Sequence, residues 1–146
     1  MGGPDNYFIW EMNGYIIAFD AAVDLVAINA SYGGNYTCHV FNAAGNDSAS
    51  ITLYVAPYIV TPLEEQILIA NGSNVNINCV SAGFPAPTVK WVDALDSEVS
   101  SSSQLEFSPV LFGDEGFYQC VASTEIDGSN ITAVNETTLI GNQCTC

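Results

Sequence analysis

The stretch Leu105-Glu-Phe-Ser-Pro-Val-Leu-Phe-Gly-Asp-Glu-Gly-Phe-Tyr-Gln-Cys120 decides the fold of this chain. It contains Asp114-x-Gly116-x-Tyr118-x-Cys120, in which a tyrosine stands two residues before a cysteine. This arrangement is typical of a corner where the chain enters a buried strand and the tyrosine hydroxyl bonds back to upstream backbone. The stretch therefore predicts a sharp turn that leads into a core strand.

A second cysteine precedes this stretch on its own patterned segment. Val75, Ile77 and Cys79 are apolar at alternate positions, which predicts a strand with one buried face. Trp91 lies between Cys79 and Cys120. The order Cys–Trp–Cys at this spacing is typical of two antiparallel sheets that pack face to face and are joined across the core. The sequence therefore predicts an all-β sandwich.

These motifs together resemble the intermediate-type (I-set) immunoglobulin domains, over about residues 8–140. The resemblance implies an immunoglobulin-like β-sandwich with a disulfide between Cys79 and Cys120 and with Trp91 packed against it. It is specific for the fold and unspecific for the member of the family, so function has to be argued separately.

The same pattern occurs a second time 82 residues earlier, and a fixed period of this kind indicates repeated modules. The earlier copy ends at Cys38, and Trp10 stands where Trp91 stands, one residue out of phase. The counterparts of Tyr118, Gly116, Val110, Phe107 and Leu105 are, in that order, Tyr36, Gly34, Ile28, Leu25 and Val23.

The earlier copy is incomplete, because too few residues precede it to supply two strands and none of them is cysteine. We expect residues 1–56 to be a partial immunoglobulin-like domain with strands C to G, lacking strands A and B and leaving Cys38 unpaired. Residues 57–141 are expected to form a complete I-set domain, and residues 142–146 a tail or the start of a further module. The chain is accordingly expected to be a fragment of a longer tandem array.

The charge balance excludes several classes of partner. The chain carries 16 acidic residues against a single base, Lys90, for a net charge of −15. Nucleic-acid binding needs Lys and Arg to displace counterions from phosphates, so no nucleic acid is expected as a partner. Asp20 and Asp24 interrupt the apolar run at residues 15–28, so direct membrane insertion is not expected either. With no second base available, Asp114 is expected to accept backbone N–H bonds instead of forming the ion pair found in many relatives.

Six positions match the N-glycosylation acceptor pattern, more than the composition produces by chance. They predict an extracellular or cell-surface glycoprotein with glycans attached on exposed loops and strand faces. Asn35 is expected to be the least available, because it adjoins Tyr36 at the packed corner. The candidates are Asn29, Asn35, Asn46, Asn71, Asn130 and Asn135.

No catalytic or metal-binding set can be assembled from the sequence. The single histidine, His39, follows Cys38 on a predicted strand and should point outward as an ordinary surface side chain. The acidic clusters match no calcium loop, and Cys144 and Cys146 have no second pair with which to bind zinc. We therefore predict that the chain is not an enzyme and has no cofactor and no metal site.

The resemblance implies binding through exposed faces and loops. The first expectation is cell adhesion or recognition by protein–protein contacts, homophilic or heterophilic, including contacts with other immunoglobulin modules. One alternative is a structural rod segment of a secreted, hemicentin-like matrix protein. Another is the ligand-binding ectodomain of a receptor kinase or phosphatase.

Overall fold

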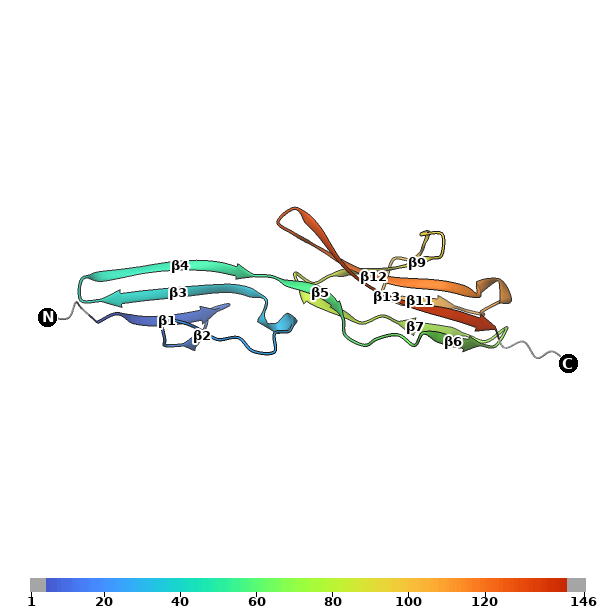
Figure 1. Ribbon diagram of the computed structural model, residues 1–146, viewed down its shortest axis with the longest axis horizontal. Helices are drawn as coiled ribbons and strands as arrows, with labels where there is room; N and C mark the ends of the chain where they lie inside the picture. The colour runs from blue at the N-terminus through green and yellow to red at the C-terminus, as the bar shows by residue number, and fades with distance from the viewer. Residues whose placement is uncertain (1–4, 142–146) are drawn as a thin grey trace. The chain divides into compact units, whose positions relative to one another are not determined.

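The regular secondary structure of the chain is almost entirely β-strand, as a computed structural model that describes residues 5–141 shows (Figure 1). It divides into two compact units, Met1–Val55 (unit 1) and Ala56–Cys146 (unit 2). Each unit is described by itself. Cys144 and Cys146 lie outside the described residues.

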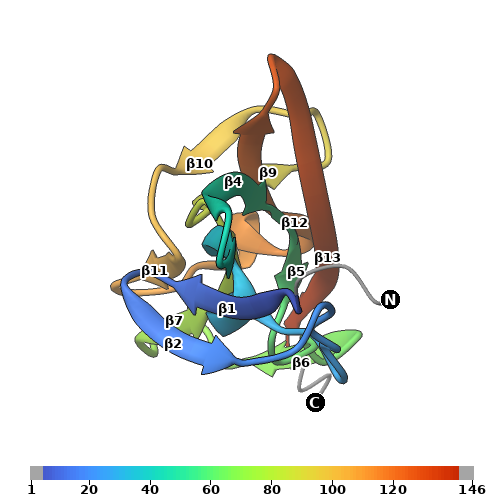
Figure 2. The ribbon, with the colours of Figure 1, turned by 90° about the vertical axis from the view of Figure 1, so that its left-hand side faces the viewer.

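Unit 1 contains a single antiparallel sheet with the order β2-β1-β3-β4 among its described residues (Figure 1). Figure 2 shows β1 and β2 of this sheet side by side. A short 3₁₀ turn, η1 (Ala30–Tyr32), leads into β3. The β3–β4 hairpin turns at Gly45, whose positive φ of 153° suits glycine. The strands are β1 (Tyr7–Met12), β2 (Tyr15–Ala18), β3 (Gly34–Asn42) and β4 (Gly45–Leu53).

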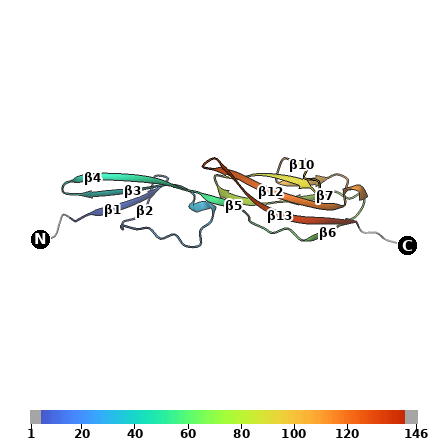
Figure 3. The same ribbon diagram turned by 45° about the horizontal axis from the view of Figure 1, so that its top comes forward.

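Unit 2 contains a five-stranded sheet with the order β10-β9-β12-β13-β6, together with the strand pairs β11-β7 and β5-β8. All pairs in the five-stranded sheet are antiparallel except β13 with β6, and the long β12–β13 hairpin dominates it (Figure 3). The turn η2 (Phe112–Asp114) leads into β12. The strands are β5 (Val55–Ile59), β6 (Gln66–Ile69), β7 (Val75–Asn78), β8 (Ser81–Phe84), β9 (Thr88–Asp93), β10 (Glu98–Ser100), β11 (Gln104–Phe107), β12 (Gly116–Ile126) and β13 (Ser129–Gly141).

The core of unit 2 lies between its two layers. Alternate residues of β12 are buried, which is the period-2 pattern of a strand with one face in the core. The fully buried apolar side chains come from both layers, so each sheet supplies one wall. The prediction of an all-β sandwich is confirmed. The largest buried side chains are those of Trp91, Leu105, Leu139 and Val110.

Unit 1 departs from the expected strand order at one place. Val23 and Leu25, the counterparts of Leu105 and Phe107, were expected on a strand, but residues 21–29 are irregular. In unit 2 the corresponding segment is β11, which forms its ladder with β7. Within the described residues unit 1 has no strand in the position of β7, so the backbone of residues 21–29 has no ladder partner.

Candidate functional site

A disulfide and a tryptophan occupy the centre of unit 2. Cys79 and Cys120 are bonded to each other, and both are fully buried. Cys120 of β12 pairs in register with Trp91 of β9, which has no exposed surface. The Trp91 indole N–H donates a hydrogen bond to the Ser103 carbonyl at 3.0 Å, so its one polar group is satisfied. The disulfide and Trp91 stabilise the sandwich from inside. Because they are fully buried, a partner can bind only to other residues, on the surface of unit 2.

The corner before β12 has the geometry that the motif predicts. The Tyr118 hydroxyl donates to the Asp114 carbonyl at 2.8 Å. The Asp114 carboxylate accepts the Leu111 backbone N–H at 2.8 Å, as expected in a chain with so few bases. Gly116 has a φ of 133°, a conformation that side chains other than glycine rarely adopt.

Because Tyr118 is buried, the stability of unit 2 is expected to depend on pH in the alkaline range. Burial first, and then the negative charges of Asp114 and Asp93, raise its pKa above the ordinary value of 10.0. The folded pKa is higher than the unfolded one, so this contribution to stability is complete below about pH 10 and is lost as the pH rises through the folded pKa.

Tyr118→Phe is therefore expected to cost unit 2 about 0.5–1.5 kcal/mol at pH 8, from the lost hydrogen bond. It should also make stability fall less steeply above about pH 10. Urea midpoints of both proteins at pH 8 and above pH 10, with Cys38 alkylated to prevent thiol exchange, measure this. Equal alkaline losses in both proteins would contradict the assignment.

Unit 1 repeats the corner and the tryptophan of unit 2. The Tyr36 hydroxyl donates to the Tyr32 carbonyl four residues upstream, as Tyr118 does to Asp114. Trp10 of β1 pairs in register with Cys38 of β3. Trp10 therefore pairs with Cys38 as Trp91 pairs with Cys120, although the two copies differ by one residue in the spacing between tryptophan and cysteine.

Among residues 5–55, the face of unit 1 that carries Trp10 lacks the covering layer present in unit 2. Cys38 is half-buried and unbonded within residues 5–141. The Trp10 indole Nε1 is buried and finds no hydrogen-bond partner in the part of the chain that the structure describes. Beside it is an apolar pocket of about 150 Å³. Its lining consists of Trp10, Val23, Leu25, Tyr36, Ile51 and Leu53.

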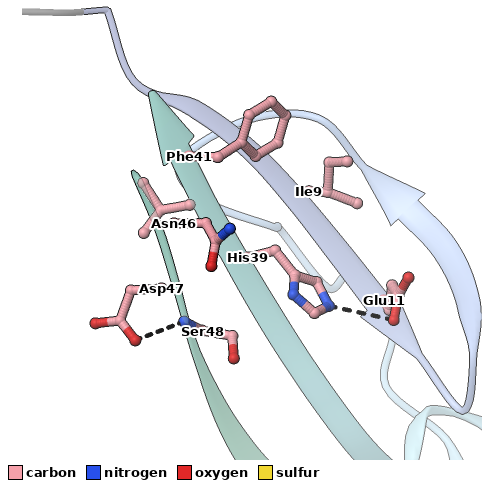
Figure 4. A pocket seen from close by; sticks show the side chains of 8 residues that line it. Ile9, Glu11, His39, Phe41, Asn46, Asp47 and Ser48 are labelled. Carbon is pink, nitrogen blue, oxygen red and sulfur yellow. Dashed lines mark hydrogen bonds and ion pairs between the residues drawn. The ribbon is translucent and has the colours of Figure 1, made fainter. Parts of the chain in front are cut away.

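The opposite, outer face of the same sheet carries His39. Its Nε2 lies 3.3 Å from Glu11 Oε2, and both side chains border a groove of about 640 Å³ (Figure 4). His39 thus points away from Cys38, as the strand alternation predicts. Among residues 5–141, no group of three or more His, Cys, Asp or Glu side chains could hold a metal ion. Nor does this part of the chain contain a helix with the length and apolar character needed to cross a bilayer.

The six acceptor asparagines differ in availability. Asn35 is exposed on the outer face of unit 1, although it adjoins the packed Tyr36, and its low availability for glycosylation stays a prediction. Asn135 is only half-exposed, because it pairs with Cys120 and its side chain shares the core-facing side of β13. The amide oxygens of four accept hydrogen bonds: Asn29 from Ser31, Asn35 from Thr52, Asn71 from Phe112 and Asn135 from Leu63.

Two rows of side chains that run across neighbouring strands were not apparent from the sequence. In unit 2, Lys90, Val121 and Val134 lie in register on β9, β12 and β13. In unit 1, Tyr7, Phe41 and Asn46 lie in register on β1, β3 and β4. The alternation of side chains along each strand could have shown that the apolar residues of both rows point outward. Which of them lie next to each other depends on the order of the strands in the sheet.

Comparison with known proteins gives one family and a consistent fold. An immunoglobulin domain model matches residues 56–124. The chain is 28% identical to human hemicentin-1 over 141 residues, covering 82% of the chain and 2% of hemicentin-1. It is 31% identical to the neural cell adhesion molecule L1 of Takifugu rubripes over 119 residues, covering 73% of the chain and 9% of L1. The chain therefore spans only a small part of each relative.

A solved structure of Dpr11 IG1 bound to DIP-gamma IG+IG2 superposes with a TM-score of 0.62, covering 94% of this chain and 84% of that one. The identity is 16%, so this likeness supports the fold alone.

Proposed function

This chain carries an immunoglobulin domain over residues 56–124, and from that premise we propose that it is an extracellular segment that mediates cell adhesion or recognition by binding proteins. The partner is a second copy of the chain or another protein, including other immunoglobulin modules. Similarity to a neural cell adhesion molecule over 119 residues supports this choice. Attached glycans and a place at the cell surface are part of the same proposal.

The observation that carries the proposal is the row Lys90–Val121–Val134 on the outer face of unit 2. Val134 is 53% exposed, and it pairs with Val121, which pairs with Lys90. The core of unit 2 does not use these side chains, since it lies on the other side of the same strands. Adjacent apolar side chains on an outer strand face can form the apolar core of an interface, and the polar residues around them its rim.

The charge of the chain restricts how two copies associate. At a net charge of −15 they repel each other, although at physiological salt the screening length is about 8 Å. A homophilic contact therefore has to use apolar side chains or bridging cations, and added salt or calcium should strengthen it. A contact that salt weakens would indicate a basic, heterophilic partner instead.

The test is binding of the glycosylated chain to itself and to an array of purified immunoglobulin ectodomains, with the chain displayed multivalently on beads. Val134→Asp is expected to weaken binding at least tenfold, because it places a charge in the apolar row. Leu95→Asp is the matched control, since Leu95 is 86% exposed in the turn between β9 and β10. Absence of binding across the array, or an equal loss from both variants, would refute the proposal.

A structural role in a secreted matrix protein is the second candidate, supported by the similarity to hemicentin-1 over 141 residues. A receptor ectodomain is the third. The flanking sequence separates the three: a transmembrane helix with a short tail supports adhesion, many further repeats support a matrix rod, and a kinase or phosphatase domain supports a receptor.

A further inference from the structure

Three neighbouring strands of unit 1 bring two aromatic rings and an acceptor asparagine into one row. Tyr7 of β1 pairs with Phe41 of β3, and Phe41 pairs with Asn46 of β4. The rings of Tyr7 and Phe41 stack with centroids 5.7 Å apart and planes inclined by 23°. Figure 4 shows Phe41 and Asn46 on the same side of the sheet, beside the groove.

Both rings are exposed, which is unfavourable for side chains of this size. Tyr7 is 58% and Phe41 39% accessible to solvent. Burying an aromatic side chain gains about 1.5–3 kcal/mol, so a stacked pair left in water forgoes a substantial part of that energy. A covering group attached nearby would recover it.

Asn46 is the residue that can carry such a group. It begins the acceptor triplet Asn46-Asp47-Ser48. Its side chain is exposed and makes no hydrogen bond within residues 5–141, in contrast to the four hydrogen-bonded acceptor asparagines. Side chains directly opposite across a ladder have Cβ atoms about 5 Å apart, which places a sugar linked to Asn46 next to the Phe41 ring.

The geometry of the row and of the groove suits the first sugars of an N-glycan. Adjacent strands lie about 4.8 Å apart, so the step from Asn46 to Tyr7 is about 10 Å, the reach of the two linked N-acetylglucosamines at the base of an N-glycan. The apolar C–H face of a pyranose packs on the negative face of an aromatic ring. His39 and Glu11, 3.3 Å apart along the groove, are available to hydrogen-bond the acetamido and hydroxyl groups.

We propose that an N-glycan on Asn46 folds back onto the Tyr7–Phe41 pair and forms a fixed covering on the outer face of unit 1. The inference rests on the proposed extracellular location, which makes glycosylation possible. It assigns the groove to the chain's own glycan and leaves the Lys90–Val121–Val134 row of unit 2 for protein contacts.

The test combines occupancy with a double-mutant cycle on the full 146-residue chain secreted by a glycosylating cell. Ser48→Ala removes the acceptor triplet while keeping Asn46, and Phe41→Thr removes the ring while keeping a strand-forming residue. Loss of the glycan is expected to lower the melting temperature of unit 1 by about 4–8 °C when Phe41 is present. It should have little effect when Thr replaces it.

Asn130 provides the matched control. It is exposed, its amide makes no hydrogen bond among the described residues, and it faces Glu125 instead of an aromatic ring. Thr132→Ala removes its triplet, and the loss of that glycan is expected to leave the melting of unit 2 unchanged. Equal effects at Asn46 and Asn130 would indicate a general influence of glycans and overturn the inference.

Proton NMR of the glycan trimmed to its first sugar gives a readout that does not depend on thermal unfolding. Ring current should shift the sugar protons upfield in the parent chain and in Phe41→Tyr, but not in Phe41→Thr. Unshifted protons in the parent chain would overturn the inference, as would an unoccupied Asn46 beside an occupied Asn71 or Asn130. A secreted chain with none of its six asparagines occupied would contradict the proposed glycoprotein function as well.

Discussion

Replacing both Cys79 and Cys120 by alanine is expected to lower the free energy of unfolding of unit 2 by about 4 kcal/mol. The bridge joins residues separated by 41 positions, and the chain-entropy model gives about 4 kcal/mol for closing a loop of that length. For a domain of this size the loss corresponds to a fall in melting temperature of roughly 15–30 °C. Calorimetry of the oxidised chain and of the double variant measures it.

Thiol labelling of the folded, oxidised chain provides the control for that experiment. Cys38 is expected to react readily, because it is half-buried on an incompletely covered face. Cys79 and Cys120 should not react until the bridge is reduced. Labelling of Cys79 or Cys120 in secreted, folded protein would contradict the extracellular assignment. A Cys38 bridged to Cys144 or Cys146 would show that the proposed domain boundaries are wrong.

The two tryptophans should respond very differently to the same substitution. Trp91→Ala is expected to cost unit 2 about 3–5 kcal/mol, since the side chain is fully buried against the disulfide and its removal leaves a cavity. Trp10→Ala should cost unit 1 only about 1–1.5 kcal/mol, because Trp10 is half-buried and its indole N–H makes no hydrogen bond within the described residues. The pair occupies equivalent register positions, so the difference isolates the effect of the covering layer.

Hydrogen exchange of peptides from β12 and from β3 reports the stability of each unit in the intact chain. An equal cost in both units would show that the Trp10 face is covered in solution. We propose that the cover it lacks includes a strand equivalent to β7, the partner of β11 in the opposing layer of unit 2. That strand would supply a ladder partner for Val23–Leu25 and, directly after it, a second cysteine for Cys38.

The sequence alone predicted the features that depend on short stretches of chain. The alternation around Cys79 and the string from Asp114 to Cys120 predicted the buried strands, and the resemblance that they carry implied the disulfide and the tyrosine corner. These signals are local, because a strand exposes every second residue to one face and a corner is closed by groups four residues apart. The second tyrosine corner, at Tyr36, could be predicted from the sequence for the same reason.

Tertiary structure alone decided which distant residues meet. In the sequence, Trp10 is one residue out of phase with Trp91. In the β1–β3 ladder it nevertheless pairs with Cys38, as Trp91 pairs with Cys120. Val23–Leu25 has the pattern of a strand but forms none, because a strand also requires hydrogen-bond partners from another segment. The rows Lys90–Val121–Val134 and Tyr7–Phe41–Asn46 join residues from three strands each. Their members are neighbours only through sheet order and register, which backbone hydrogen bonds between distant segments determine.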